Sequence, residues 1–339
     1  MGPTVTIIVL NHNGKKFLKD CFDSLKAQSY KEFEVIIVDN GSTDGSLALI
    51  REHYPEFTLI ANKKNLGFAE GNNQGINVAR GKYIVTLNND TKVDEEWLWF
   101  LVGAADDNPE AGMFTSKILS MQSPDTIDSV GVNLCVDGMS RGRGRLEKDD
   151  GRFDKVEEIF FPSACAALYK KQMLVDTGPF DADFFAYCED TDLGLRGRWA
   201  GWKALFVPEA RVYHHYSGTG GKYSSFKAYL VERNHVFVAF KNFPTGLLLF
   251  FPFLTLYRYL LQFISILKKE GSASELAGDV PPMEIIKIIF KAYFDVLISF
   301  PKLRKKRQAV KQMKKISDEQ FFELLTKYNL SLKELVFKK

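Results

Sequence analysis

The first 91 residues alternate between short apolar runs and segments with helical spacing, and this alternation restricts the fold more than any other feature. Apolar, β-branched runs at 5–10, 34–38, 57–61 and 83–87 have the length and composition of buried strands. The segments between them place apolar residues three and four positions apart, which is typical of helices. Regular alternation of this kind predicts an α/β fold with a parallel, doubly wound sheet.

Polar side chains follow the predicted strands. The set comprises Asn11, Asp39, Asn65 and the consecutive Asn88, Asn89 and Asp90. In open α/β sheets, ligands bind at the carboxyl ends of the strands. A carboxylate with amide neighbours, as at Asp90, suits a hard divalent cation that shares its remaining positions with a diphosphate. The alternative is an Asn/Asp turn after a core strand.

Asp39 has a similar pair of interpretations. Its carboxylate can accept the imide N–H of uracil or thymine, or it can close an Asx turn at the end of its strand. A dinucleotide-binding site would require GxGxxG directly after a strand. The first two strands are followed by NHNG and DNGSTDG instead, so a dinucleotide-binding enzyme is excluded. A sugar nucleotidyltransferase would need a loop rich in Gly and Arg after the first strand, which NHNG does not supply.

The segment FFAYCEDTDL at 184–193 predicts a helix that begins near Glu189. Asp192 and Arg196 stand four residues apart on it and can form an ion pair. Glu189 and Asp190 fall at its start, where unpaired backbone N–H groups hold carboxylates ionised. Such a carboxylate could act as a general base on a sugar hydroxyl, and the alternative is an acidic N-cap.

Two smaller features bear on the site. His214 and His215 are adjacent in a strand-like run, so only one of them can face it. Residues 137–151 are rich in Gly and Arg, and we predict a solvent-exposed loop with its arginines outside the site.

Residues 241–339 differ in composition from the rest. From 243 to 267 the only charge is Arg258, but the prolines and Arg258 favour an interfacial or re-entrant hairpin over a simple span. A helix at 283–300 precedes the run 302–315, which holds eight basic residues and no acidic ones. Residues 236–339 carry a net charge of +9, and residues 1–235 a net charge of −6. This pattern predicts attachment to an anionic membrane surface.

The alternative for this region is a helical bundle that forms a homodimer. Nucleic acid is not expected, because the basic run lacks interleaved aromatic residues. Cys21, Cys135, Cys165 and Cys188 are scattered, which predicts reduced thiols in a cytoplasmic protein. The first apolar run has only strand length, so no signal peptide is expected.

Together these segments resemble the family 2 glycosyltransferases, especially the bacterial rhamnosyltransferase-like branch. The resemblance covers about residues 4–240 and is carried by TIIVLNHNG (6–14), EVIIVDNGSTDGS (34–46), NKKNLGFAEGNNQGI (62–76), ARGKYIVTLNNDT (79–91) and FFAYCEDTDLGLRGRWAGW (184–202). It implies a GT-A-type doubly wound mixed sheet. It also implies that Asp39 binds the nucleotide base, that Asp90 is the last position of a DxD-type metal motif, and that Asp190 is the catalytic base. His214 would complete the metal shell, compensating for Asn88, where many relatives carry the first Asp.

The sequence therefore predicts a glycosyltransferase dependent on Mg²⁺ or Mn²⁺ that inverts the anomeric configuration. Its donor would be a nucleoside-diphosphate sugar, dTDP-rhamnose or a UDP-sugar, and its acceptor a hydroxyl of a glycan or polyprenyl-linked glycan. The catalytic domain would occupy residues 1–240, with a helical, membrane-associating region at 241–339 on the inner face of the cell membrane. The alternative is a catalytically silent nucleotide-sugar or glycan-binding module on a membrane scaffold.

Overall fold

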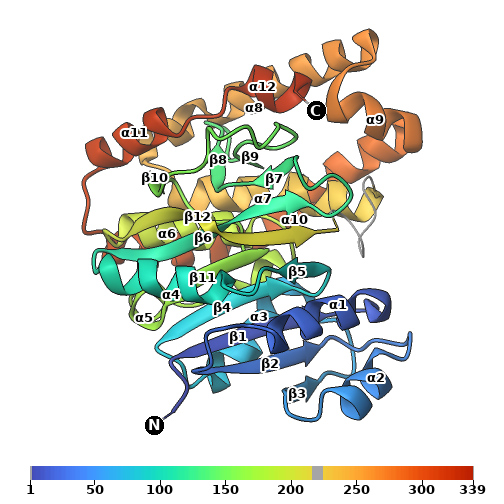
Figure 1. Ribbon diagram of the computed structural model, residues 1–339. Helices are drawn as coiled ribbons and strands as arrows, with labels where there is room; N and C mark the ends of the chain where they lie inside the picture. Colours follow the sequence, from blue (N-terminus) through green and yellow to red (C-terminus); the bar gives the residue numbers. More distant parts are fainter. Residues whose placement is uncertain (1, 216–223, 339) are drawn as a thin grey trace. The chain divides into compact units, whose positions relative to one another are not determined.

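A computed structural model describes residues 2–215 and 224–338 of the chain (Figure 1). Its contacts divide the chain into two compact units. The first comprises Met1–Val132, Gly142–Arg198 and Trp202–Thr219, and the second comprises Asn133–Arg141, Trp199–Gly201 and Gly220–Lys339.

The first unit is built on a mixed sheet, as the family resemblance implied, so the parallel sheet expected from the alternation alone is confirmed only for part of it (Figure 1). Its strands are β1 (Val5–Asn11), β2 (Phe33–Asp39), β3 (Thr58–Ala61), β4 (Tyr83–Asn88), β5 (Thr91–Val93), β6 (Ala111–Ser120), β7 (Ile127–Ser129), β10 (Glu157–Ile159), β11 (Ala166–Lys170) and β12 (Lys203–His214). The spatial order is β10-β12-β6-β11-β4-β1-β2-β3, with β5 paired to β12 and β7 to β6. The strands from β3 to β4 are mutually parallel, whereas β11 runs antiparallel to both of its neighbours. A separate two-stranded sheet pairs β8 (Val132–Leu134) with β9 (Ser140–Gly142).

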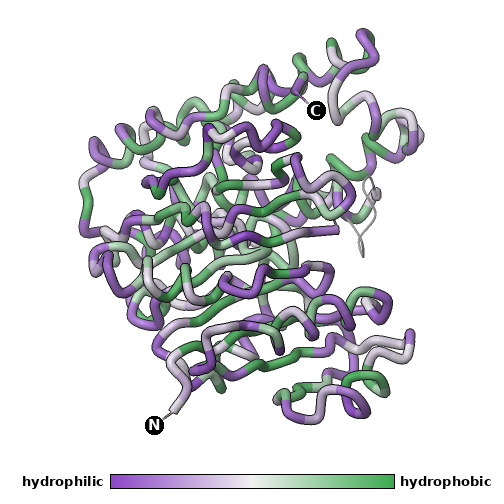
Figure 2. The backbone as a smooth tube through the Cα atoms, in the orientation of Figure 1, coloured by the Kyte–Doolittle hydropathy of each residue, from purple (hydrophilic) through white to green (hydrophobic). Residues whose placement is uncertain are grey.

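Both faces of the central strands are buried, which explains why β1, β2 and β4 are apolar almost throughout (Figure 2). Side chains alternate across β1, so that Val5, Ile7 and Val9 join one core and Ile8 joins the other. The helices of this unit are α1 (Lys15–Lys26), α2 (Ser46–His53), α3 (Gly67–Val78), α4 (Trp97–Asp107), α5 (Lys171–Thr177) and α6 (Glu189–Trp199), with the 3₁₀ turn η1 (Ala182–Phe184). Residues of α1, α2 and α4 pack into the first core, and residues of α3, α5 and α6 into the second.

The strand order reverses at β1, the kind of position at which doubly wound sheets bind ligands. The chain proceeds outward from β1 to β2 and β3, then returns to the other side of β1 with β4. Such a reversal leaves a crevice at the carboxyl ends of the two central strands. Asn11 at the end of β1 is in register with Asp39 at the end of β2, and Asn88 ends β4. The predicted polar residues of β1, β2 and β4 therefore meet at this edge.

The second unit is helical. Its helices are α7 (Ser225–Asn242), α8 (Thr245–Lys268), α9 (Gly271–Asp279), α10 (Pro282–Met313), α11 (Asp318–Lys327) and α12 (Leu332–Phe337). A capping box of Ser317 and Gln320 begins α11. The predicted hairpin at 243–267 is wrong, because α8 continues as one helix through Pro252. Packing of one face of α8 outweighs the hydrogen bond that proline cannot donate.

A buried ionic cluster joins α8 to the rest of the second unit. Arg258 is fully buried, and its Nε donates to Asp137 Oδ2 at 2.6 Å while its Nη2 donates to Glu232 Oε1 at 3.0 Å. Tyr259 also donates its hydroxyl to Glu232. Burial opposes ionisation of Glu232, but the Arg258 guanidinium outweighs it and lowers the pKa of Glu232 to about 2.

We expect Arg258→Met to leave Asp137 and Glu232 buried without their cation. Breaking such a cluster from one side costs about 3–5 kcal/mol, and urea unfolding followed by fluorescence of Trp199 should show this loss. In the wild type, the depressed pKa of Glu232 contributes stability above about pH 4.5 that disappears as the pH falls toward 2. Arg304→Met, at an exposed position of α10, is the control. Equal stability of the two variants would contradict this account of the cluster.

Candidate functional site

A chain of hydrogen bonds links the ends of the three central strands. Asn89 Nδ2 donates to Asn11 Oδ1 at 2.7 Å, and Asn11 Nδ2 donates to Asp39 Oδ2 at 2.7 Å. Gly14 is required beside it, because a Cβ there would lie 2.0 Å from Asn89 Nδ2. The structure thus brings together three of the residues that the sequence singled out.

Asp39 is fully buried in this arrangement. Its second oxygen accepts the backbone N–H of Ser42 at 2.9 Å, which is the Asx turn that the sequence also allowed. Each carboxylate oxygen accepts one protein hydrogen bond and keeps a lone pair. The carboxylate therefore keeps acceptor capacity for a nucleotide base, but because Asp39 is fully buried, a base would have to displace a neighbouring group to reach it.

Asn65 and Asn88 lie beside this chain. Asn65 is exposed, and its Oδ1 accepts from the backbone N–H of Gly67 at 2.9 Å and from Asn40 Nδ2 at 3.3 Å, so it orders the turn into α3. Asn88 is half-buried, and its backbone is fixed by Cys165, whose carbonyl accepts the Asn88 N–H at 2.8 Å.

Strand pairing brings Asp90 and His214 together. The register of β5 against β12 places Thr91 opposite His214, so Asp90 lies next to that histidine although the two residues are 124 positions apart in the sequence. Asp90 Oδ1 and His214 Nε2 are 3.3 Å apart, and both residues are buried. His215 faces elsewhere, since its ring packs on Phe17 and its Nδ1 lies 3.2 Å from Gln122 Nε2.

Asp128 and Arg145 extend this pair, and sequence reasoning missed both. Asp128 Oδ2 lies 2.6 Å from His214 Nδ1, and Asp128 Oδ1 accepts from Arg145 Nη1 at 3.1 Å. Arg145, predicted to lie in a solvent-exposed loop, has only 19% of its side chain exposed. Burial opposes protonation of His214, but Cys165 and the carboxylates of Asp128 and Asp90 outweigh it and raise the pKa of His214 well above its ordinary value.

These residues fit a metal ion shared with a ligand. Among the residues that the structure describes, no group of three or more His, Cys, Asp or Glu side chains is arranged to hold a metal by itself. Adjacent ligands on an octahedral ion, each about 2.1 Å from it, lie about 3 Å apart, which is close to the separation of Asp90 Oδ1 and His214 Nε2. Asp128 supplies the carboxylate that commonly orients a metal-binding histidine. Two protein ligands leave the other positions for phosphate oxygens and water.

Asp190 and Glu189 begin α6, as predicted, and occupy different environments. Asp190 Oδ2 accepts the backbone N–H of Ala164 at 3.3 Å, and its Oδ1 accepts that of Thr191 at 2.7 Å. Burial raises the pKa of Asp190, and these two N–H groups partly offset that effect. Glu189 is buried, and its Oε2 has no hydrogen-bond partner among the described residues. Burial and then the Asp190 carboxylate raise the pKa of Glu189 well above its ordinary value.

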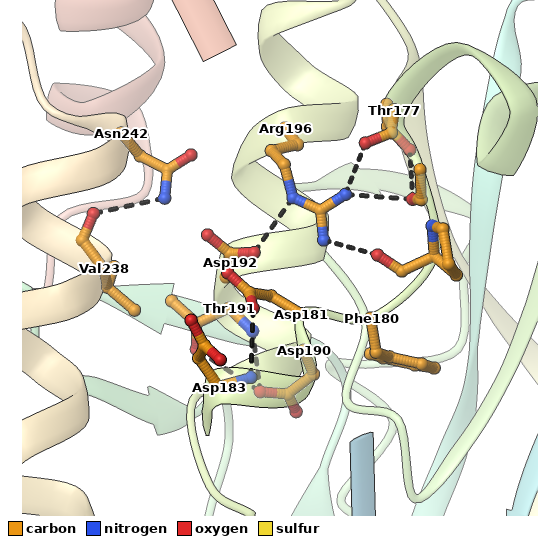
Figure 3. A network of polar contacts seen from close by, with 12 residues as sticks. Thr177, Phe180, Asp181, Asp183, Asp190, Thr191, Asp192, Arg196, Val238 and Asn242 are labelled. Atoms are coloured by element: carbon orange, nitrogen blue, oxygen red, sulfur yellow. Dashed lines mark hydrogen bonds and ion pairs between the residues drawn. The ribbon is translucent and has the colours of Figure 1, made fainter. Parts of the chain in front are cut away.

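Asp192 is held in an ion pair with Arg196, as Figure 3 shows, and so has a structural role. Arg196 Nε donates to Asp192 Oδ2 at 2.9 Å, which confirms the predicted ion pair. The other guanidinium nitrogens of Arg196 donate to the carbonyl groups of Thr177, Gly178 and Pro179. Of the three acidic residues at the start of α6, Asp190 is therefore the one with intermediate exposure and with its charged form supported by backbone N–H groups.

The backbone before α6 is strained. The φ angles of Phe185, Tyr187 and Cys188 are 65°, 67° and 66°, and residues other than glycine rarely adopt such positive values. The Phe185 carbonyl accepts the N–H of Ala69 at 3.1 Å, which ties this segment to α3. Strain of this kind concentrates at functional sites, where the surrounding structure maintains it.

Ala164 and Cys165 connect the two halves of the site. The N–H of Ala164 supports Asp190, while Cys165 interacts with His214 and receives the N–H of Asn88. These two residues are adjacent in the chain and lead into β11, which pairs with β4. Asp190, whose pKa is raised, and the Asp90–His214 pair therefore lie on either side of the Ala164–Cys165 segment.

The sequence matches the family described as "Glycosyl transferase family 2" over residues 6–178, just over half of the chain. It is 27% identical over 227 residues to the O-antigen biosynthesis protein RfbC of Myxococcus xanthus, covering 64% of this chain and 18% of that protein. It is 24% identical over 244 residues to the N-acetylglucosaminyl-diphospho-decaprenol L-rhamnosyltransferase of Mycobacterium tuberculosis, covering 66% of this chain and 79% of that protein.

A solved structure shows the same fold. The mannosyltransferase PcManGT from Pyrobaculum calidifontis, in complex with GDP-Man and Mn²⁺, is similar with a TM-score of 0.53 and 17% identity. The similarity covers 91% of this chain and 86% of that one. The chain belongs to glycosyl transferase family 2 and has the GT-A fold.

Proposed function

We propose that the protein is a metal-dependent, inverting hexosyltransferase that uses a nucleoside-diphosphate sugar. The observation that carries this proposal is the placement of two functional groups around Ala164 and Cys165. On one side lies the Asp90–His214 pair, suited to an ion that binds diphosphate, and on the other lies Asp190, suited to accept a proton. Transfer from a nucleotide sugar requires both groups near the same anomeric carbon.

Asp90 and His214 would hold Mg²⁺ or Mn²⁺. When bound there, the ion would supply positive charge that stabilises the departing diphosphate. Asp128 keeps the His214 ring oriented with Nε2 toward Asp90, because it occupies Nδ1. Asn88 ends β4, and Asn89 follows it and leads to Asp90. Asp39 and Asn65 would form the nucleoside side of the pocket, with Asn11 joining Asp39 to Asn89.

Asp190 would take the proton from the acceptor hydroxyl as its oxygen attacks the anomeric carbon. Glu189 and Asp190 resemble pairs of carboxyl groups whose environments separate their pKa values. Glu189, deeply buried, holds a proton more strongly, whereas the N–H groups of Ala164 and Thr191 favour the ionised form of Asp190. A base on one face and a leaving group on the other give a single displacement and hence inversion.

The preferred nucleotide base is inferred from Asp39, and the acceptor is inferred from a relative. A carboxylate at Asp39 suits the imide of uracil or thymine, which favours a UDP-sugar or dTDP-rhamnose. The mycobacterial relative named above is an enzyme for a polyprenyl-linked glycan, and by analogy we propose such a glycan as the acceptor. We further propose a catalytic domain at 1–240 and peripheral attachment of 241–339 to the inner face of the membrane.

A donor screen tests the proposal. Purified protein is incubated with Mn²⁺ and, in separate reactions, UDP-glucose, UDP-N-acetylglucosamine, dTDP-rhamnose and GDP-mannose, and release of the nucleoside diphosphate is measured without acceptor and with lipid-linked glycans. We expect one pyrimidine donor to be consumed, faster with acceptor and not in EDTA. A chain that binds a nucleotide sugar tightly but consumes none with any acceptor would be the silent binding module instead.

We expect Asp128→Asn to weaken Mn²⁺ binding about 10–100-fold, as substitution of such orienting groups typically does. Asparagine retains the size of the side chain but loses the charge that fixes the His214 tautomer. The dissociation constant of Mn²⁺ in the presence of UDP or dTDP is measured by electron paramagnetic resonance of the free ion, so no turnover is required. Asp125→Asn, an exposed carboxylate three residues away, is the control. Unchanged Mn²⁺ affinity in Asp128→Asn would remove Asp128 from the site.

A further inference from the structure

Helix α8 has the length and composition of a transmembrane segment. Among the described residues it alone meets both criteria, with 24 residues from Thr245 to Lys268. A helix of that length extends about 36 Å, enough to cross the hydrocarbon core of a bilayer. Its contacts within the second unit lead to a different conclusion.

One face of α8 is fixed to protein. Its buried residues are Thr255, Arg258, Leu261 and Ser265, which recur at helical spacing. Arg258 at the centre of this face is bound to Asp137 and Glu232. Insertion of α8 across a bilayer would carry Arg258 away from both carboxylates or take the carboxylates into hydrocarbon, and either outcome is strongly unfavourable.

The opposite face of α8 is apolar and exposed. Its large side chains are Leu249, Phe253, Leu256, Tyr257, Leu260, Phe263 and Leu267, with exposed fractions from 42% to 71%. The first half of α10 carries a matching row made of Met283, Ile286, Phe290, Phe294, Leu297 and Ile298. Exposed apolar surfaces of this extent mark sites of association.

The two rows lie on the same side of the helix pair. The hydroxyl groups of Tyr259 on α8 and Tyr293 on α10 are 3.3 Å apart, so these two side chains point toward each other and bridge the helices. On both helices, the residues three positions before, one position after and four positions after the tyrosine are exposed. Viewed along the helix axis, all three lie roughly 40–100° from the tyrosine in the same direction of rotation. The helices run in opposite directions (Figure 1). Because the two tyrosines point toward each other and the helix axes are antiparallel, equal rotations place both apolar rows on the same side. We call the surface made of these two rows the α8–α10 face.

Basic residues continue the α8–α10 face. Arg304 and Lys305, about two turns beyond the apolar row of α10, and Lys311 are exposed. Other cations of the predicted run serve the fold: Arg307 donates to the carbonyl groups of Phe240 and Phe243 at 2.6 and 2.7 Å, and Lys314 pairs with Asp318 at 2.6 Å. A second copy of the chain on this face would bring like charges together, whereas anionic lipid headgroups complement them.

We propose that the α8–α10 face is an in-plane membrane-docking surface: both helices lie at the boundary between headgroups and acyl chains of an anionic leaflet, and α8 does not cross the bilayer. The apolar rows enter the boundary region, and Arg304, Lys305 and Lys311 contact the headgroups. The proposal rests on the proposed membrane attachment and is independent of the proposed transfer reaction.

Vesicle flotation measures the docking. The full chain is mixed at low salt with vesicles of phosphatidylcholine and phosphatidylglycerol in a ratio of about 2:1, without nucleotide. We expect Phe253→Glu/Leu260→Glu to abolish flotation and Arg304→Gln/Lys305→Gln/Lys311→Gln to weaken it about 100-fold, from the contribution of each basic residue near such a surface. The matched controls are Val175→Glu, an exposed apolar site in the first unit, and Lys19→Gln/Lys155→Gln/Lys203→Gln.

Depth measurements separate in-plane docking from a span. A fluorophore is attached to Cys introduced at Leu249, Leu256 or Leu267, the background of the identically treated wild type is subtracted, and quenching by lipids labelled at different depths is compared. We expect all three positions to report the same shallow depth. A deep Leu256 between shallow ends, or a full chain that ignores these vesicles and sediments as a dimer, would overturn the proposal. Nucleoside-diphosphate binding is measured in parallel without vesicles. It shows whether the proposed transferase function fails independently of the membrane docking.

Discussion

Replacement of Asp90 by Ala should reduce sugar transfer by about 10³-fold or more. Asp90 is one of two side chains placed to hold the cation, and cations of this kind stabilise a leaving group by several kcal/mol, with each 1.36 kcal/mol worth a factor of ten in rate. The same substitution should abolish the part of nucleoside-diphosphate binding that depends on Mn²⁺. Both effects are measurable, by steady-state kinetics and by titration calorimetry with and without EDTA.

Two comparisons make this test specific. His214→Ala should weaken Mn²⁺ binding without eliminating it, because Asp90 remains. Asp20→Asn, an exposed carboxylate on α1, should behave as the wild type. If Asp90→Ala retained full turnover in EDTA, the metal-dependent mechanism would be wrong.

The second large effect is expected from Asp190→Asn. General base catalysis typically contributes about 10²–10⁴-fold, so kcat should fall by that factor. Donor affinity should change little, because the base acts only in the transition state. Slow hydrolysis of the donor by water should persist, since Asp90 and His214 are intact. Kinetics with saturating donor, together with a direct donor-binding measurement, separate these effects.

Glu189→Gln is the control for the assignment of the base, and its rate should remain well above that of Asp190→Asn. Because burial raises the pKa of Asp190, activity should decline on the acid side at a pH above the ordinary carboxyl range. The direction follows from the requirement for the ionised form: protonated Asp190 cannot accept a proton. A nearly normal Asp190→Asn enzyme beside an inactive Glu189→Gln enzyme would reverse the two roles.

The sequence was sufficient to predict much of the first unit. Strands β1, β2 and β4 are buried on both faces, so they read as continuous apolar runs whose ends are marked by Asn11, Asp39 and Asn88. The ion pair of Asp192 with Arg196 follows from helical spacing alone. In contrast, the hairpin predicted at 243–267 failed, because the burial of one face of α8 could not be seen in its composition.

The links that sequence reasoning missed depend on long-range packing. Asp128 and Arg145 lie in segments with weak periodicity, and only the pairing of β7 with β6 and of β6 with β12 brings Asp128 to His214. A lone aspartate in a polar stretch carries no signal of that contact. The engagement of Asp39 by Asn11 likewise depends on the register of β1 against β2, which the sequence does not specify.

A thermal-shift titration tests the central claim most directly. The protein is titrated with UDP, dTDP, GDP, CDP and ADP in Mn²⁺ and in EDTA. Ligand at 100 times its Kd stabilises the folded state by about 2.7 kcal/mol. The account predicts that Tm rises by about 5 °C or more with UDP or dTDP in Mn²⁺, and that EDTA or Asp90→Ala removes most of the rise. An unchanged Tm with all five nucleotides, or an equal rise in EDTA, would contradict it.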